Sequence, residues 1–206
     1  MPRPTKQDPE RGAARTRLLE AARDVIRRQG FAATSVDQLC AAAGVTKGAF
    51  FHHFKDKAAL GVAAADFWGE TTGAFFEGAP YHRPADPLER VLAYIAFRRS
   101  IIGDELFEFT CLAGTLAQET YESAPEIGAA AGRAIFGHAA TLEADIAAAM
   151  AARGISGGWT AASLARHTQT VLQGGFVLAK AGQDPQMVHE SLDHLERYIR
   201  LLFQAA

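Results

Sequence analysis

Apolar residues recur at spacings of three and four along almost the whole chain, which places them on one face of an α-helix. Alanine is abundant and runs of β-branched residues are few, and both features favour helices over strands. The pattern predicts an all-α protein. The expected helices lie near residues 9–29, 35–43, 47–53, 56–77, 86–102, 105–121, 125–152, 160–181 and 185–204.

The first three expected helices form a small unit at the N-terminus. Gly30 is a natural stop for the first helix, and Thr34 or Ser35 can cap the second. Gly44 can supply the positive φ that a tight helix-turn-helix needs, and Thr46 can cap the third helix. The residues expected to face inward are Leu18, Ala22, Val25, Ile26, Phe31, Val36, Leu39, Cys40 and Ala43.

These helices predict two domains. Residues 1–55, helical from about residue 10, form the helix-turn-helix unit, and residues 56–206 form a larger helical bundle. The fourth helix connects the two, and a turn-rich segment, "GAPYHRPADP", follows it.

The net charge of −2 hides an asymmetry between these parts. Residues 1–60 carry eleven Lys and Arg against six Asp and Glu, whereas the remainder carries ten against seventeen. A basic module joined to an acidic one is typical of a protein whose first part meets a polyanion, although scattered surface charge is the simpler explanation.

Composition also indicates a compartment. The N-terminal segment "MPRPTKQDPERGAARTR" lacks the apolar core of a signal peptide, and no stretch approaches the length of a transmembrane helix. Cys40 and Cys111 are too few to suggest a disulfide framework. We expect a cytoplasmic protein without a membrane partner.

The segment "TKGAFFHHF", residues 46–54, combines three aromatic rings, two histidines and a lysine. Neighbouring helical residues point about 100° apart, so His52 and His53 are poorly placed to share a metal ion. Phe50 and Phe54 are four residues apart and would pack inward. Core packing does not explain Lys47, and we expect no metal or cofactor here.

Residues 18–60 resemble the DNA-binding domain of the TetR family, through the Gly30-Phe31 corner, Thr34-Ser35, "AAGV" and "KGAFFHHFKDK". The resemblance implies an operator-binding surface. Phe51 stands where many relatives have a tyrosine, so one hydroxyl–phosphate bond, worth about 1 kcal/mol, is absent. The implied DNA-contacting residues are Thr34, Ser35, Thr46, Lys47, Gly48, Phe51, His52 and Lys57.

A short recognition helix reads few base pairs, so useful affinity requires two copies one turn of DNA apart. The resemblance implies a homodimer through the last two helices. Glycines 174 and 175 would permit close approach there. The apolar area would come from Val171, Phe176, Leu192, Leu195, Ile199 and Leu202, unless these residues only complete the bundle of one chain.

The resemblance also implies a small-molecule effector inside the bundle. Aromatic residues and polar residues in apolar settings are candidates for the lining, although each can equally be ordinary core or surface. The expected pocket residues are Phe67, Trp68, Tyr94, Phe97, Cys111, Thr115, Gln118, His167, Gln173 and Phe176.

Cys111 raises a further hypothesis. The segments "FTCLAGTLAQE" and "VLQGGFVLAKAGQD" resemble a TetR subgroup whose repressors control reductases and respond to reactive electrophiles. Cys111 and Lys180 correspond to a cysteine and a lysine of that subgroup, and a nearby ammonium favours the reactive thiolate. A small cysteine packed as an apolar residue is the alternative, as it is for Cys40.

Together these features predict a ligand-responsive regulator, most simply a repressor, that binds a palindromic operator as a homodimer. An effector would shift the fourth helix and so change the separation of the two DNA-binding units. The alternative is an enzyme or carrier with an incidental basic domain, but the chain shows no nucleophile–base arrangement, phosphate loop or metal spacing.

Overall fold

The structure is a computed structural model that describes residues 9–204, and it confirms the all-α expectation. No strand occurs within that range. The first eight residues and the last two, which we assigned to the two expected domains, lie outside the described residues. The elements are α1 Pro9–Gln29, α2 Val36–Ala43, α3 Lys47–His53, α4 Lys57–Glu77, a 3₁₀ turn Pro80–His82, α5 Pro87–Ser100, α6 Leu106–Phe109, α7 Leu112–Thr120, α8 Pro125–Ala152, α9 Ala161–Gly182 and α10 Gln186–Gln204.

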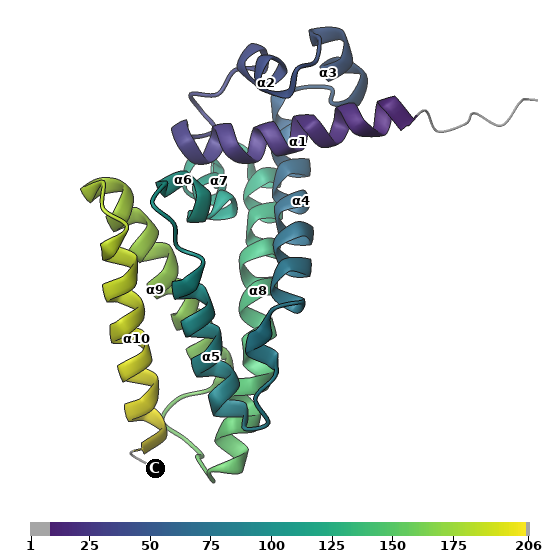
Figure 1. Cartoon of the computed structure of the whole chain (residues 1–206). Coiled ribbons are helices and arrows are strands. Elements are labelled where there is room, and N and C mark those ends of the chain that lie inside the picture. The colour runs from purple at the N-terminus through teal and green to yellow at the C-terminus, as the bar shows by residue number, and fades with distance from the viewer. Residues whose placement is uncertain (1–8, 205–206) are drawn as a thin grey trace, which may run out of the picture.

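The first three helices form one end of the molecule, and α1 lies across the top of the remaining bundle (Figure 1). Helix α4 descends from this end beside α8. Helix α5 packs on α8, and α9 packs on both α8 and α10. The short helices α6 and α7 lie directly under α1, so they join the tip to the body.

Local sequence explains the sharp turns at the tip. Ser35 caps α2 in a reciprocal capping box with Gln38, and Gly44 ends that helix with φ 62°. The Thr46 hydroxyl then accepts from the amide of Ala49 and begins α3. These caps fix the geometry between α2 and α3 that the sequence predicts.

Two hydrophobic clusters fill the interior. The first contains the inner faces of α1, α2 and α3 and continues into α4, α7 and α8, where Leu60, Leu116 and Ile127 are fully buried. The second lies farther from the tip, among α5, α8, α9 and α10. Because the first cluster crosses residues 55–56, packed side chains join the tip to the bundle.

The expected helix over 105–121 is wrong in one respect, because it is two helices. The backbone is extended at Thr110 (φ −76°, ψ 156°) and at Cys111, which is the N-cap of α7. The Sγ atom of Cys111 accepts from the amide of Gly114 at 3.3 Å. Cys111 therefore lies at the start of a helix, in a break that the apolar spacing alone does not reveal.

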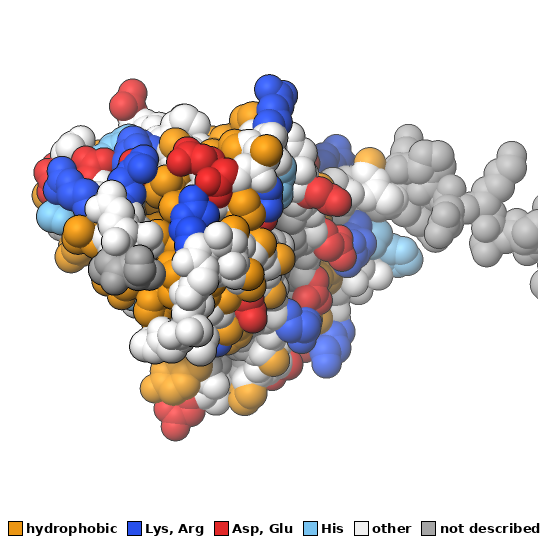
Figure 2. Space-filling model, turned by 90° about the horizontal axis from the view of Figure 1, so that it is seen from below, with side chains coloured by type: hydrophobic (Ala, Val, Ile, Leu, Met, Phe, Trp, Pro, Cys, Tyr) orange, Lys and Arg blue, Asp and Glu red, His pale blue; other side chains and the backbone are white. Residues whose placement is uncertain are grey.

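Among the described residues, no helix has both the length and the apolar character needed to cross a bilayer. The face opposite the tip shows Lys and Arg side chains interspersed with Asp and Glu among hydrophobic ones (Figure 2). No large block of one charge dominates that view.

Candidate nucleic-acid interface and effector cavity

Helix α3 is anchored to the rest of the tip by the aromatic side chains on its inner face. Phe50 is completely buried and Phe54 is 4% exposed, as expected from their spacing. The opposite side of the tip is open to solvent, and Phe51 is 55% exposed there. The expected contact residues that the fold leaves exposed are Ser35, Thr46, Lys47, Gly48, Phe51 and His52.

Lys47 projects from the first turn of α3 and pairs with Asp37 of α2, with Nζ and Oδ1 2.7 Å apart. Both side chains are more than half exposed. An exposed pair of this kind contributes little to stability, so Lys47 is free to exchange Asp37 for another anion.

Two of the expected contact residues face inward. Thr34 is 1% exposed, and its hydroxyl donates to the carbonyl of Gly30 at 2.6 Å, so it is not the helix cap. The Lys57 ammonium donates to the carbonyls of Phe31 and Thr34, each at 2.9 Å. These groups hold the α1–α2 corner against α4, and neither directs a free polar group outward.

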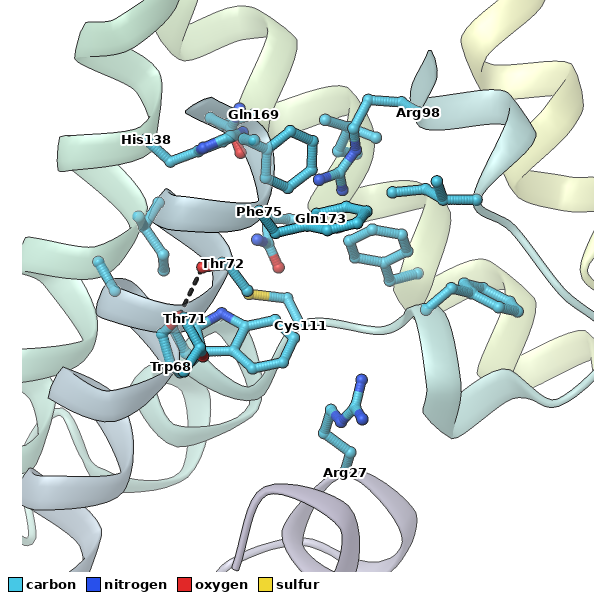
Figure 3. Close-up of a pocket in the computed structure, with 18 of the residues that line it drawn as sticks. Arg27, Trp68, Thr71, Thr72, Phe75, Arg98, Cys111, His138, Gln169 and Gln173 are labelled. Carbon is cyan, nitrogen blue, oxygen red and sulfur yellow. Dashed lines mark hydrogen bonds between the residues drawn. The ribbon is translucent and has the colours of Figure 1, made fainter. Parts of the chain in front are cut away.

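A cavity of about 380 Å³ lies beneath the tip, between α1, α4, α5, α8 and α9. Figure 3 shows Arg27 entering from α1 at one end, Arg98 at the other, and Cys111 between them. Its walls are largely apolar, with polar groups at a few points. The lining includes Trp68, Thr71, Thr72, Phe75, Phe76, Phe109, His138, Gln169, Gln173 and Phe176.

The structure brings four of the expected pocket residues to this cavity: Trp68, Cys111, Gln173 and Phe176. Thr115 and Gln118 line a smaller neighbouring cavity instead. The remaining expectations are corrected by packing. Phe67 packs in the first cluster, Tyr94 and Phe97 belong to the second, and His167 lies on the outer face of α9 against Tyr198.

The sequence reasoning missed the arginines and the histidine of this cavity. Arg27 is 6% exposed although it lies in the last turn of α1, where basic residues are common at the surface. Arg98 and His138 come from α5 and α8, forty residues apart in the chain. Only long-range packing brings them together, and no local pattern signals it.

His138 is part of a buried polar chain. Its Nε2 atom is 2.9 Å from the Tyr94 hydroxyl, which also accepts from the Gln169 amide at 3.4 Å. Burial, with a smaller contribution from the Arg98 charge, lowers the pKa of His138 to about 4. The imidazole is therefore neutral near pH 7.

This histidine makes stability depend on pH. The unfolded chain binds a proton at the ordinary pKa of 6.5, whereas the folded chain does not until about pH 4, so stability falls as the pH drops through that window. Between pH 7 and pH 5, we expect the free energy of unfolding, measured in urea, to fall by about 2 kcal/mol more in the parent than in His138→Gln. His52→Gln, at an exposed site on α3, should lose as much stability as the parent; equal losses in all three proteins would refute the assignment.

The smaller cavity brings Cys111 and Lys180 together, between α7 and α9. Burial, and then the Arg27 charge, lowers the pKa of the Lys180 ammonium. Glu119 of α7 lines the same cavity, and it also accepts from the amide of Ala32 at 2.7 Å. Cys40, in contrast, is buried in the first cluster with 6% of its surface exposed.

The surface of the last helices differs from the expected interface. Leu192, Leu195, Ile199 and Phe176 are at most 5% exposed, so they complete the bundle of a single chain. Gly175 packs under Ser191, whereas Gly174 is exposed. The large apolar side chains that remain exposed on α8, α9 and α10 are Phe136, Val177, Leu178, Tyr198 and Leu201, called here the α8–α10 face.

Several proteins of known sequence are similar to parts of this chain. A segment of 111 residues is 27% identical to the transcriptional regulator AcuR of Cereibacter sphaeroides, covering 54% of this chain and 51% of AcuR. A segment of 60 residues is 42% identical to the HTH-type transcriptional regulator AcrR of Shigella flexneri, covering 29% of this chain and 27% of AcrR. The matched segments thus span about half or less of these relatives.

Solved structures share the whole fold. The regulatory protein TetR from Rhodobacter sphaeroides superimposes with a TM-score of 0.79 at 23% identity, covering 89% of this chain and 97% of that one. The reduced form of E. coli NemR gives a TM-score of 0.76 at 20% identity, covering 89% and 95%. At these identities the likeness concerns the fold alone.

Two family models account for most of the chain. The model described as bacterial regulatory proteins, tetR family, matches residues 18–64, which contain α2, α3 and the start of α4. The model described as the C-terminal domain of LmrA/YxaF-like transcriptional regulators matches residues 87–194. This chain belongs to the TetR family of bacterial regulatory proteins.

Proposed function

We propose that this protein is a ligand-responsive transcriptional regulator, most simply a repressor, that binds operator DNA as a homodimer. The observation that carries the proposal is the outer side of the tip: an exposed Lys47, Gly48, Phe51 and His52 on a helix whose inner side is locked by Phe50. The Lys47 cation can contact phosphate, the missing side chain of Gly48 permits close approach, and the rings of Phe51 and His52 are flat. Such a helix suits the major groove and its phosphates. The family membership and the matched regulators support the same function.

The test is a gel shift with the DNA upstream of the protein's own gene, at increasing salt. Affinity should fall steeply with salt because phosphate contacts release counterions. Lys47→Ala should weaken binding and flatten this dependence, whereas Asp37→Asn should strengthen binding by freeing Lys47 and removing an acidic group. Salt-independent binding, or the same affinity in both variants and the parent, would refute the proposed surface.

The dimer is proposed to form through the α8–α10 face. Two DNA-binding tips must be held about one turn of DNA apart, and this face offers the largest exposed apolar side chains near the last two helices. His167 contacts Tyr198 edge to face, with 5.3 Å between the ring centroids, and this contact joins the exposed sides of α9 and α10 into one surface.

A single acidic residue should break this dimer. Leu178 is 56% exposed, so Leu178→Glu costs a single chain little but would bury a charge between two copies. We expect light scattering after gel filtration to give the mass of one chain. Tyr121→Glu is the matched control, at a 72% exposed site outside the α8–α10 face, and should stay dimeric. A dimeric Leu178→Glu variant would exclude this part of the interface.

A sensor of electrophiles is a second proposed role, favoured by the common cavity of Cys111 and Lys180. The Cys111 sulfur lies at the N-terminus of α7, and thiolates are favoured beside such a helix end and beside cations. Limiting N-ethylmaleimide, followed by mass spectrometry, should modify Cys111 before the buried Cys40. The modification should release the operator, and the Lys180→Met substitution should slow the modification of Cys111. An unmodified Cys111 would end this proposal.

A further inference from the structure

The charged side chains around the cavity beneath the tip differ in whether the protein itself supplies their partners. At the tip end, Arg23 donates to both carboxylate oxygens of Asp24, at 2.7 and 3.0 Å. Arg27 donates to Asp24 at 3.1 Å and to the backbone carbonyls of Glu108 and Thr110 at 2.9 and 3.3 Å. These two guanidinium groups are occupied by the protein itself.

Arg98, at the other end, has no such partner. Its guanidinium carbon lies 5.0 Å from the ring centroid of Phe76 and 5.7 Å from that of Phe176. No hydrogen bond or ion pair joins Arg98 to any side chain or backbone group among residues 12–204. Ring faces attract the positive charge but accept few of the five N–H groups, which need acceptors in their plane.

The neighbouring arginines of α5 show that this is particular to Arg98. Arg90 pairs with Asp145 at 2.7 Å, and Arg99 pairs with Asp193 and Glu196. Arg98 is the cation of this helix that faces the cavity, and Figure 3 shows its guanidinium directed toward Phe75 and Gln173. The fold therefore pairs Arg90 and Arg99 with carboxylates and leaves Arg98 without an acidic partner among the described residues.

The rest of the lining agrees with an anionic guest. The cavity lining contains three arginines and one carboxylate, that of the exposed Glu108 on α6, and its histidine is neutral. Between the ends, Trp68, Phe75 and Phe109 offer apolar surface. The Gln173 amide also lacks a protein partner among the described residues, so it can bond a second polar group of a guest.

We infer that this cavity takes a small organic carboxylate with an apolar or aromatic body, its carboxylate held by Arg98. This deepens the proposed function, on which it rests, by naming the class of effector. The planar guanidinium matches a carboxylate through two parallel hydrogen bonds. A phosphate dianion is disfavoured, because only one cation has open donors and the surrounding walls are apolar.

The test uses fluorescence of Trp68 in a Trp159→Phe background, which leaves one tryptophan, in the cavity wall. The probes are butyrate, cinnamate and 4-phenylbutyrate, each compared with its own neutral amide. We expect at least one acid to bind about tenfold more tightly than its amide, the preference a charge-assisted pair provides. If all three acids bind no better than their amides, the inference fails.

Variants locate the contact. Arg98→Met should remove the preference of acid over amide, and Arg98→Lys should keep part of it, because an ammonium retains the charge but not the planar fork. Arg83→Met removes a charge from an exposed loop position and should preserve the preference. Preference retained in a folded Arg98→Met protein, verified by circular dichroism, would overturn the assignment of Arg98.

The binding assay contains no DNA, so its outcome is separate from that of the proposed function. If the protein binds acids through Arg98 but binds no DNA, the inferred carboxylate site stands and the proposed regulatory function is refuted. Operator binding with no preference for acids would do the reverse. If both hold, the preferred acid should also weaken operator binding in the parent and not in Arg98→Met.

Discussion

Gly48→Glu should abolish operator binding, with a loss of about 100-fold or more, while leaving the protein folded. A Cβ at Gly48 would meet only the Thr46 hydroxyl oxygen, at an ordinary 3.7 Å, so the fold has room for a side chain. An acidic residue in the first turn also suits the helix dipole. The same carboxylate would face the phosphates and prevent the helix from entering the groove.

The measurement is fluorescence anisotropy with operator DNA, alongside thermal unfolding. Gly73→Glu is the matched control: Gly73 lies in α4, is exposed, and a Cβ there meets nothing within 4 Å. It adds the same charge away from the tip and should bind DNA nearly as the parent does. Gly48→Ala should be as stable as the parent or up to about 1 kcal/mol more stable, yet bind less tightly. Parent-like DNA binding by Gly48→Glu would mean that α3 is not the reading helix.

Arg27→Met should lower the free energy of unfolding by about 3 kcal/mol, because it removes the donor that ties α1 to the α6–α7 segment. The side chain is 6% exposed and bonds the carbonyls of Glu108 and Thr110. Without it, these two carbonyls lose their buried side-chain donor, whereas Asp24 keeps Arg23. Urea unfolding at pH 7 measures the change.

Arg28→Met provides the control for this prediction. Arg28 is the next residue, is exposed, and lies over the Phe107 ring with 3.3 Å from its guanidinium carbon to the centroid. Its loss should cost no more than about 1 kcal/mol. A loss below that value in Arg27→Met would show that the buried bonds are dispensable.

Arg27 also connects the proposed effector cavity to the DNA-binding tip. Its partners lie in the α6–α7 segment, which carries Cys111 at its break, and α7 carries Glu119, which accepts from Ala32 at the α1–α2 corner. A guest that displaces this segment would therefore move α1 as well as α4. We expect Arg27→Lys, which keeps the charge but cannot make all these bonds, to fold and to show weaker release of the operator by effectors.

Much of the tip could be predicted because its determinants are local. Ser35, Gly44 and Thr46 act within three or four residues of their own positions, and Phe50 and Phe54 reveal the buried side of α3 by their spacing. Thr34 and Lys57, which the sequence placed at the DNA surface, have side chains that bond carbonyls of the α1–α2 corner instead of pointing outward. Spacing along the chain indicates the helix face on which a residue lies, but it does not indicate which acceptor its side chain bonds.

The body was less predictable for the same reason. A list of aromatic residues identified Trp68 and Phe176 as cavity lining but could not separate them from Phe97 or Tyr94, which do not line the cavity. The break at Thr110 and Cys111 disturbs neither the apolar spacing nor the helix-forming composition. Leu178 and Leu192 are both leucines within predicted helices, yet the first is exposed and the second is buried. Only the packing of α9 on α10 distinguishes them.

The sequence by itself determined the helices, the helix-turn-helix with its outward Lys47 and Gly48, and the family, because caps, glycine conformation and apolar period act over a few residues. Only the tertiary structure decided which charges are satisfied. Arg23, Arg27, Arg90 and Arg99 find partners within the chain and Arg98 does not. The physical reason is that hydrogen-bond satisfaction depends on groups brought together from distant helices, whereas a helix is fixed by its neighbours in the chain.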